Sequence, residues 1–165
     1  MFSTLEYYNE FSLHRKLTLD LLLSISDSRL SEAPISKAGT IGKQFRHLID
    51  ISKCYIDALE NQKLVFERND IDHSLEIDKP RLIIELKLTA ERLKSFIESA
   101  DPLEFSQEVI DCLESKKYVG VERTSPRIIV RWMIEHEIFH EGQLALYIRN
   151  FGMHFPESWV TWGLG

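Results

Sequence analysis

The sequence predicts an all-α protein built from four long helices. Apolar residues recur at helical spacing in four segments of the chain, and prolines and glycines fall mainly between those segments. Apolar residues make up 44% of the 165 residues and charged residues 28%, which is ordinary for a globular protein. This length fits one domain and can bury a core without disulfides or a structural metal. We therefore expect a single domain spanning residues 1–165.

The first helix is predicted over residues 4–26, and the second over residues 41–61. The first segment places its apolar residues among polar ones in an amphipathic pattern: Leu5, Tyr8, Phe11, Leu19, Leu22 and Leu23. Pro34 and Gly39 then interrupt the helical pattern, and Thr40 is placed to cap the second helix. His47 lies beside the apolar stripe of this second helix, so we expect it to border the core.

A charged, irregular segment over residues 63–79 separates the second and third helices. The third helix is predicted from Pro80, which suits a first helical turn, to Ala100, and Asp101-Pro102 ends it. Two short stretches follow, residues 105–112 and 118–123, whose Val, Ile, Tyr and Phe content favours strands. A small β-hairpin is therefore predicted between the third and fourth helices.

The fourth helix is predicted from Pro126 to Phe151, with Ser125 as its cap and Gly152 as its stop. Its apolar stripe contains two histidines: Ile129, Trp132, Met133, His136, His140, Leu144, Tyr147 and Ile148. Histidines on a buried face need partners, because an unsatisfied imidazole costs about 1–3 kcal/mol. They are either a hydrogen-bonded pair in the core or metal ligands.

His136 and His140 are four residues apart, so their imidazoles project from one helix face, one turn apart. With Glu137 they also form an HExxH string, which in zinc peptidases supplies two ligands and a general base. The extended peptidase motif would need glycine at position 143 and histidine at 146, where this chain has Gln143 and Leu146.

A metal site needs at least one further ligand. His47 is the best third histidine, because adjacent helices of a bundle can bring it to His136 and His140. Glu157 is the downstream ligand that a peptidase would use. A ferritin-like site would need two Glu-x-x-His motifs, and only the one ending at His140 is present. The remaining histidines are not assigned to the metal: His14, His73 and His154.

Two motifs together resemble the DinB/YfiT-like superfamily of metal-binding four-helix proteins. They are Thr40-Ile-Gly-Lys-Gln-Phe-Arg-His-Leu48 and His136-Glu-Ile-Phe-His-Glu-Gly-Gln143, with Tyr147-Ile-Arg-Asn-Phe-Gly152 in support. The resemblance implies a four-helix bundle over essentially the whole chain. It also implies a divalent metal held by His47, His136 and His140, with zinc expected first and nickel, iron or manganese as alternatives. The chain departs from the pattern at Phe139 and Glu141.

The superfamily includes thiol transferases, in which the metal activates a low-molecular-weight thiol for attack on an electrophile. The resemblance thus implies a metal-dependent thiol S-transferase acting in detoxification or stress response, with a small-molecule thiol or electrophile as partner. Gln44 and Gln143 lie about one turn from a ligand and are candidates for orienting a bound group. The alternative is a noncatalytic module in which the ion fastens two helices. Members commonly form dimers, so a homodimer is expected.

Charge and composition limit which binding partners and which cellular compartment are expected. The formal net charge is −6 and the basic residues are scattered, so nucleic acid is not an expected partner. The apolar runs are too short to span a membrane, and the N-terminus has no secretory pattern, so we expect a cytoplasmic protein. Cys54 and Cys112 are expected to be reduced and packed.

Two further features suggest contacts. Gly142 interrupts the fourth helix, and either a close approach of another helix or subunit or a chance surface position would explain it. The C-terminal residues 155–162 are rich in aromatic side chains, so we expect this segment to pack on the bundle core.

Overall fold

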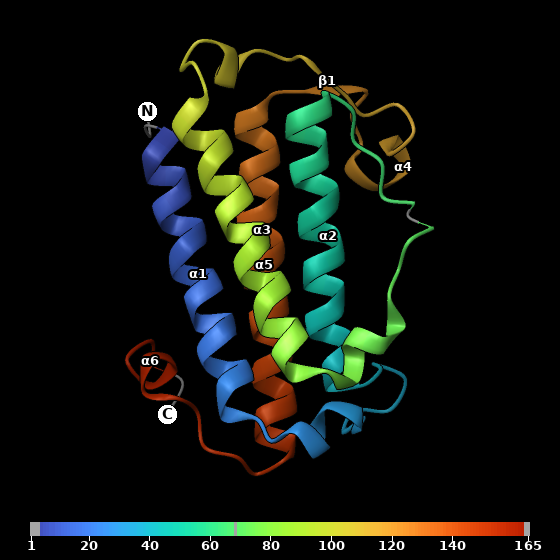
Figure 1. Cartoon of the computed structure of the whole chain (residues 1–165), viewed down its shortest axis with the longest axis vertical. Coiled ribbons are helices and arrows are strands. Elements are labelled where there is room, and N and C mark those ends of the chain that lie inside the picture. Colours follow the sequence, from blue (N-terminus) through green and yellow to red (C-terminus); the bar gives the residue numbers. More distant parts are fainter. Residues whose placement is uncertain (1–3, 68, 164–165) are drawn as a thin grey trace.

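Four long helices form the bundle in the computed structural model, which describes residues 4–67 and 69–163 (Figure 1). They are α1 (Thr4–Ser24), α2 (Ile41–Asn61), α3 (Lys79–Ser99) and α5 (Pro126–Asn150). Each of α1 and α2 packs against both α3 and α5, so the order around the bundle is α1, α3, α2, α5. The predicted helices are confirmed to within one or two residues at each end. The outermost residues of the expected domain, 1–3 and 164–165, lie outside the described residues.

Short elements connect the helices. They are η1 (Asp27–Ser31), η2 (His73–Ile77), η3 (Glu104–Ser106), β1 (Ile110–Asp111), α4 (Lys116–Val119), β2 (Arg123–Thr124) and α6 (Glu157–Val160). The strands pair antiparallel, with Ile110 opposite Thr124. The predicted hairpin is therefore present, but much of residues 105–112 and 118–123 lies outside it, and Tyr118 is in α4. The apolar residues that suggested longer strands include Phe105 and Ile110, which serve as core anchors.

Local signals in the sequence set the helix ends. The Thr40 hydroxyl accepts a hydrogen bond from the Lys43 backbone N–H at 3.1 Å, which satisfies a free donor in the first turn of α2. Asp78 caps α3 in the same way. Ser125 occupies the cap position of α5, but its side chain makes no capping hydrogen bond. Gly152 has a φ of +63° and ends α5, as predicted.

The connection between α2 and α3 runs the length of the bundle. Figure 1 shows α1 and α5 descending while α2 and α3 ascend, so the connection, described for residues 62–67 and 69–78, returns from the upper end of α2 to the lower end of α3. This segment, the crossover, passes beside α2 and includes η2. η2 packs against α2, where Arg46 donates to Glu76 at 2.8 Å. The crossover therefore lies beside the helix that carries His47.

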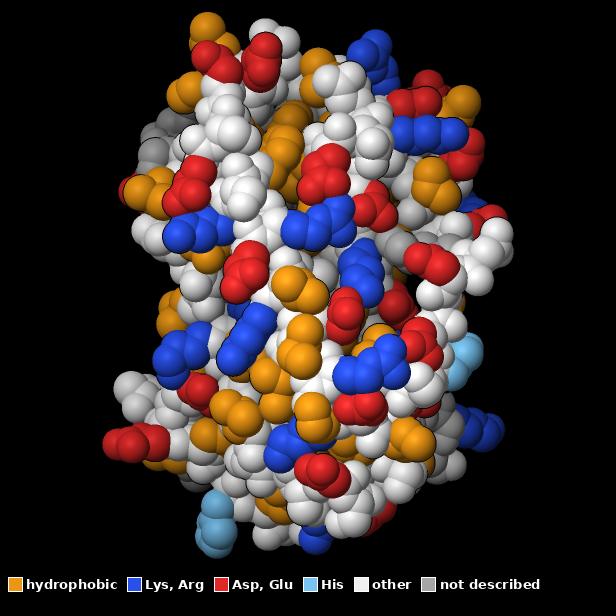
Figure 2. Space-filling model, in the orientation of Figure 1, with side chains coloured by type: hydrophobic (Ala, Val, Ile, Leu, Met, Phe, Trp, Pro, Cys, Tyr) orange, Lys and Arg blue, Asp and Glu red, His pale blue; other side chains and the backbone are white. Residues whose placement is uncertain are grey.

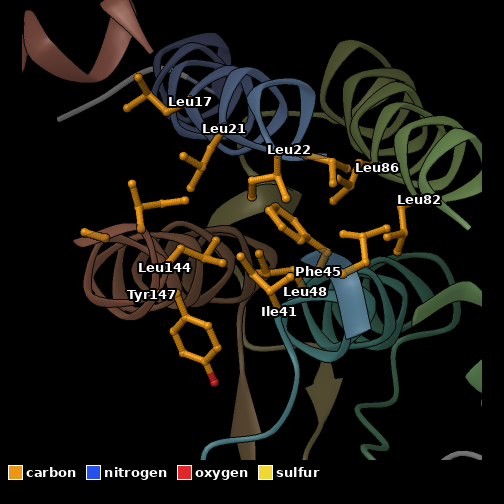
Figure 3. Packing of buried hydrophobic residues seen from close by; sticks show 14 of the residues in the cluster. Leu17, Leu21, Leu22, Ile41, Phe45, Leu48, Leu82, Leu86, Leu144 and Tyr147 are labelled. Atoms are coloured by element: carbon orange, nitrogen blue, oxygen red, sulfur yellow. The ribbon is translucent and has the colours of Figure 1, made fainter. Parts of the chain in front are cut away.

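Two apolar clusters form the core, one toward each end of the bundle. The lower cluster draws side chains from all four long helices, as the labelled residues of Figure 3 show: Leu17, Leu21, Leu22, Ile41, Phe45, Leu48, Leu82, Leu86, Leu144 and Tyr147. Trp159 of α6 joins this cluster and donates from Nε1 to the Leu17 carbonyl oxygen at 2.8 Å. The C-terminal segment therefore packs on the core, as predicted. Cys54 and Cys112 are buried and neither forms a disulfide within the described residues, also as predicted.

The outer surface mixes charges of both signs. On the face in Figure 2, basic side chains lie among acidic ones over α2 and α3, and Lys53 pairs with Glu85 between these helices at 2.7 Å. Gly142 is exposed, and a Cβ there would meet nothing within 4 Å, so the predicted contact with another helix is wrong within the described residues. None of the described helices has the length and apolar content needed to cross a bilayer.

Candidate metal centre

The three predicted ligands come together between α2 and α5. His47 lies in the second turn of α2, and His136 and His140 occupy successive turns near the middle of α5. Because α2 and α5 are antiparallel neighbours, the lower part of α2 faces the middle of α5. One potential ligand atom from each histidine lies within 4.8 Å of the other two.

The ring geometry brings imidazole nitrogens close to one another. The Nε2 atoms of His136 and His140 are 3.1 Å apart, and the ring centroid of His47 lies 5.2 Å from that of His136 and 4.9 Å from that of His140. Imidazole nitrogens bound to one tetrahedral zinc lie about 3.4 Å apart, given bonds of about 2.1 Å. The donor set and its spacing therefore suit a divalent metal ion. His140 Nδ1, the ring nitrogen that is not paired with His136, is buried without a hydrogen-bond partner among the described residues.

The surroundings keep these imidazoles neutral. Burial lowers the pKa of His47, and the positive charge of Arg46 lowers it further. Burial and the neighbouring His140 lower the pKa of His136 to about 3, and burial together with His47 lowers the pKa of His140 to about 4. Neutral imidazoles present lone pairs, which is the state that binds metal.

A buried polar network lies on the α1 side of α5. Glu137 is 1% exposed, and its two carboxylate oxygens accept from the Thr18 hydroxyl at 2.7 Å and from Arg15 Nη2 at 3.0 Å. Arg15 Nη2 also donates to the Ser52 hydroxyl at 2.8 Å. The HExxH glutamate is therefore held by α1 as the partner of a buried guanidinium. This arrangement does not favour the peptidase interpretation, in which Glu137 would act on a metal-bound water.

A second buried pair joins the same helices. His14 Nδ1 lies 3.0 Å from Glu141 Oε2, and both residues are buried. This hydrogen bond raises the pKa of His14, while burial raises the pKa of Glu141. Glu141, one of the two departures from the family pattern, thus has a partner on α1. The helical spacing of His14, Arg15 and Thr18 relative to Phe11 could have revealed these buried polar residues.

The other candidate residues do not belong to the group of potential ligands, although the Gln143 side chain interacts with His140 and partly opposes the lowering of its pKa. The described group of potential ligands contains His47, His136 and His140 and does not include Glu157, which is exposed at the start of α6. Gln44 donates to the Ala38 carbonyl oxygen at 2.8 Å and to the Tyr147 hydroxyl, so it anchors the chain before α2. His73 pairs with Glu76 on the crossover, at 3.1 Å.

The lowered pKa values predict a pH dependence for the metal-free protein. Below pH 6.5, the ordinary pKa of histidine, the unfolded chain binds protons that folded His136 and His140 still exclude. The free energy of unfolding should therefore fall as the pH drops from about 6.5 toward about 4. Urea titrations in the presence of a chelator, on wild type and on His136→Asn, would measure this. The free energy of unfolding should depend less steeply on pH in His136→Asn than in wild type. An equal dependence on pH in the two proteins would contradict the prediction.

Comparisons with known proteins bear on the family and the fold of the chain. The family model described as the DinB family matches residues 1–162. The fold is similar to that of a solved DinB-like protein, YjoA from Bacillus subtilis, with a TM-score of 0.70 and 18% sequence identity, over 93% of this chain and 97% of that one. No curated protein sequence matches the chain. The match over nearly the whole chain, together with the shared fold, shows that this protein belongs to the DinB family.

Proposed function

We propose that the chain binds a divalent metal ion through His47, His136 and His140 and uses it as a thiol S-transferase, in detoxification or stress response. The observation that supports this is the convergence of three imidazoles whose pKa values are held low. No carboxylate belongs to the described ligand group. A divalent ion bound there would keep its full positive charge and would stabilise a thiolate at an open position.

The chain's own residues would perform the supporting tasks. His47 and His136 are only partly buried, which gives a small molecule access to one side of the cluster. The Arg15 and Glu137 pair holds α1 against α5 one residue from His136, so it would fix the helix face on which the ligands stand. Zinc is the first choice for three imidazoles, and nickel, iron and manganese are the alternatives to test.

Metal titration of wild type and of three variants tests the ligand set. We expect His47→Ala, His136→Ala and His140→Ala each to weaken zinc affinity by about 100-fold, because each removes one of three ligands. His73→Ala is the matched control, since that histidine is exposed on the crossover, and it should bind zinc as wild type does. If the three variants bind zinc as tightly as the control, the proposed site is wrong.

The same samples separate an enzyme from a structural metal site. An enzyme should consume a low-molecular-weight thiol in the presence of an electrophile, and the rate should disappear in His47→Ala. A structural ion would instead leave thiol consumption at the background rate, while its removal lowered the melting temperature. The location of the ligands on two different helices favours this second function, because an ion there would fasten α2 to α5.

A further inference from the structure

A row of aromatic rings leads from the histidine cluster to the surface. The Tyr55 ring lies 6.5 Å from the His136 ring, the Phe66 ring lies 5.5 Å from Tyr55, and the Tyr118 ring lies 5.6 Å from Phe66. All three pairs are edge-to-face, with interplanar angles of 73°, 86° and 89°. The rings come from α2, the crossover and α4, so three separate segments of the chain build this row.

Exposure increases along the row. Tyr55 is 7% exposed, Phe66 is partly buried, and Tyr118 is 60% exposed. The inner end thus lies beside His136, and the outer end opens to solvent. Figure 1 shows the first part of the crossover and α4 together beside the upper half of α2, and the contact between the Phe66 and Tyr118 rings joins these two segments.

Charge at the outer end is already balanced. Lys117 Nζ lies 4.8 Å from the centroid of the Tyr118 ring and pairs with Glu67 at 2.8 Å. Because the only described cation over this ring has its own carboxylate, the row provides apolar surface without demanding a charged ligand. Aromatic rings prefer edge-to-face or offset contacts with other rings, so an additional ring gains more here than an aliphatic group of equal size.

We propose that Tyr55, Phe66 and Tyr118 form a subsite for an uncharged aromatic ring of the substrate. The proposal rests on the proposed function, in which the reacting sulfur lies beside the three histidines. Phe66 is two ring contacts from His136, with centroid distances of 6.5 and 5.5 Å, so a substrate whose aromatic ring is joined to the sulfur by a flexible chain of several carbons suits this arrangement. The row would therefore set specificity, and the histidines would supply the chemistry.

Thiol binding to the cobalt-loaded protein tests the subsite. Cobalt absorption bands report first on metal binding by the histidines and then on thiolate binding. 4-Phenylbutane-1-thiol should bind about fivefold more tightly than 4-cyclohexylbutane-1-thiol, which has the same carbon chain but no aromatic ring. Phe66→Leu and Tyr118→Leu should abolish this preference, because leucine keeps apolar area and removes the ring.

Phe139→Leu is the matched control. Phe139 is 62% exposed and its ring lies 5.4 Å from that of His140, so it is an equally exposed aromatic ring beside a different ligand. This variant should keep the fivefold preference. Equal affinity of wild type for the two thiols would overturn the subsite, and so would loss of the preference in Phe139→Leu alone.

A metal-free measurement separates this proposal from the proposed function. If cobalt does not bind, the metal-dependent function fails, but the aromatic row can still be tested with phenylmethanol. Proton NMR should then show shifts of the Phe66 and Tyr118 ring signals at millimolar phenylmethanol, and smaller shifts with cyclohexylmethanol. Unchanged ring signals would overturn the subsite whatever the metal result.

Discussion

Replacing Glu137 with alanine is expected to lower the free energy of unfolding by about 3–5 kcal/mol. The carboxylate is 1% exposed and accepts from both Thr18 and Arg15. Its removal leaves the Arg15 guanidinium, which is 2% exposed, without its charge partner. Burial already lowers the pKa of Arg15, and the charge of Glu137 opposes that shift, so the variant loses the main compensation for a buried cation. Urea denaturation followed by circular dichroism would measure the loss.

Glu135→Ala is the matched control on the same helix. Glu135 pairs with Arg131 at 2.7 Å, but both side chains are more than half exposed. Such surface pairs contribute about 0.5 kcal/mol or less, so this variant should unfold almost as wild type does. Similar losses for the two variants would refute the structural role given to Glu137. Replacing Arg15 and Glu137 together with methionine and leucine should recover much of the lost stability.

Gly42→Ala should destabilise the protein by about 3 kcal/mol, although alanine favours helices. A Cβ at this position would lie 1.8 Å from the Glu76 carbonyl oxygen and 3.1 Å from the Leu30 carbonyl oxygen. Both are backbone atoms, so neither can move aside as a flexible side chain would. The substitution must push η2 away from α2 or distort the start of α2. Chemical denaturation would measure the decrease in the free energy of unfolding.

Gly142→Ala is expected to change the stability of the protein in the opposite direction. This glycine is also helical, but a Cβ there would meet nothing within 4 Å. The variant should therefore gain about 1 kcal/mol from helix propensity alone. A gain at both positions would show that α2 and η2 are not in close contact in solution.

The sequence predicted the helices well because their signals are local. Helical spacing defined the four segments, and Thr40 and Gly152 marked ends that the structure confirms. The convergence of His47 with the pair on α5 was also predicted, from ligand spacing and family resemblance together. These features depend on a few neighbouring residues or on motifs.

The buried polar network was not predicted, because it depends on which helix faces which. Arg15 and Glu137 are 122 residues apart, and neither lies in a local sequence pattern that identifies the other as its partner. The long predicted strands failed for a related reason. Phe105 has strand-like character, but it is used in a 3₁₀ turn that inserts its ring into the core. Tertiary packing overrides local preference at such positions.

The crossover divides the candidate ligand set along the chain. His47 precedes it, His136 and His140 follow it, and the exposed residues Asn69 to Ile71 lie within it. A single backbone cut there would leave two polypeptides, each carrying part of one coordination sphere. A metal ion bound by all three histidines would then hold the two fragments together without a peptide bond between them. Reassembly of the split protein would become dependent on metal concentration, which is the basis of a two-fragment metal reporter.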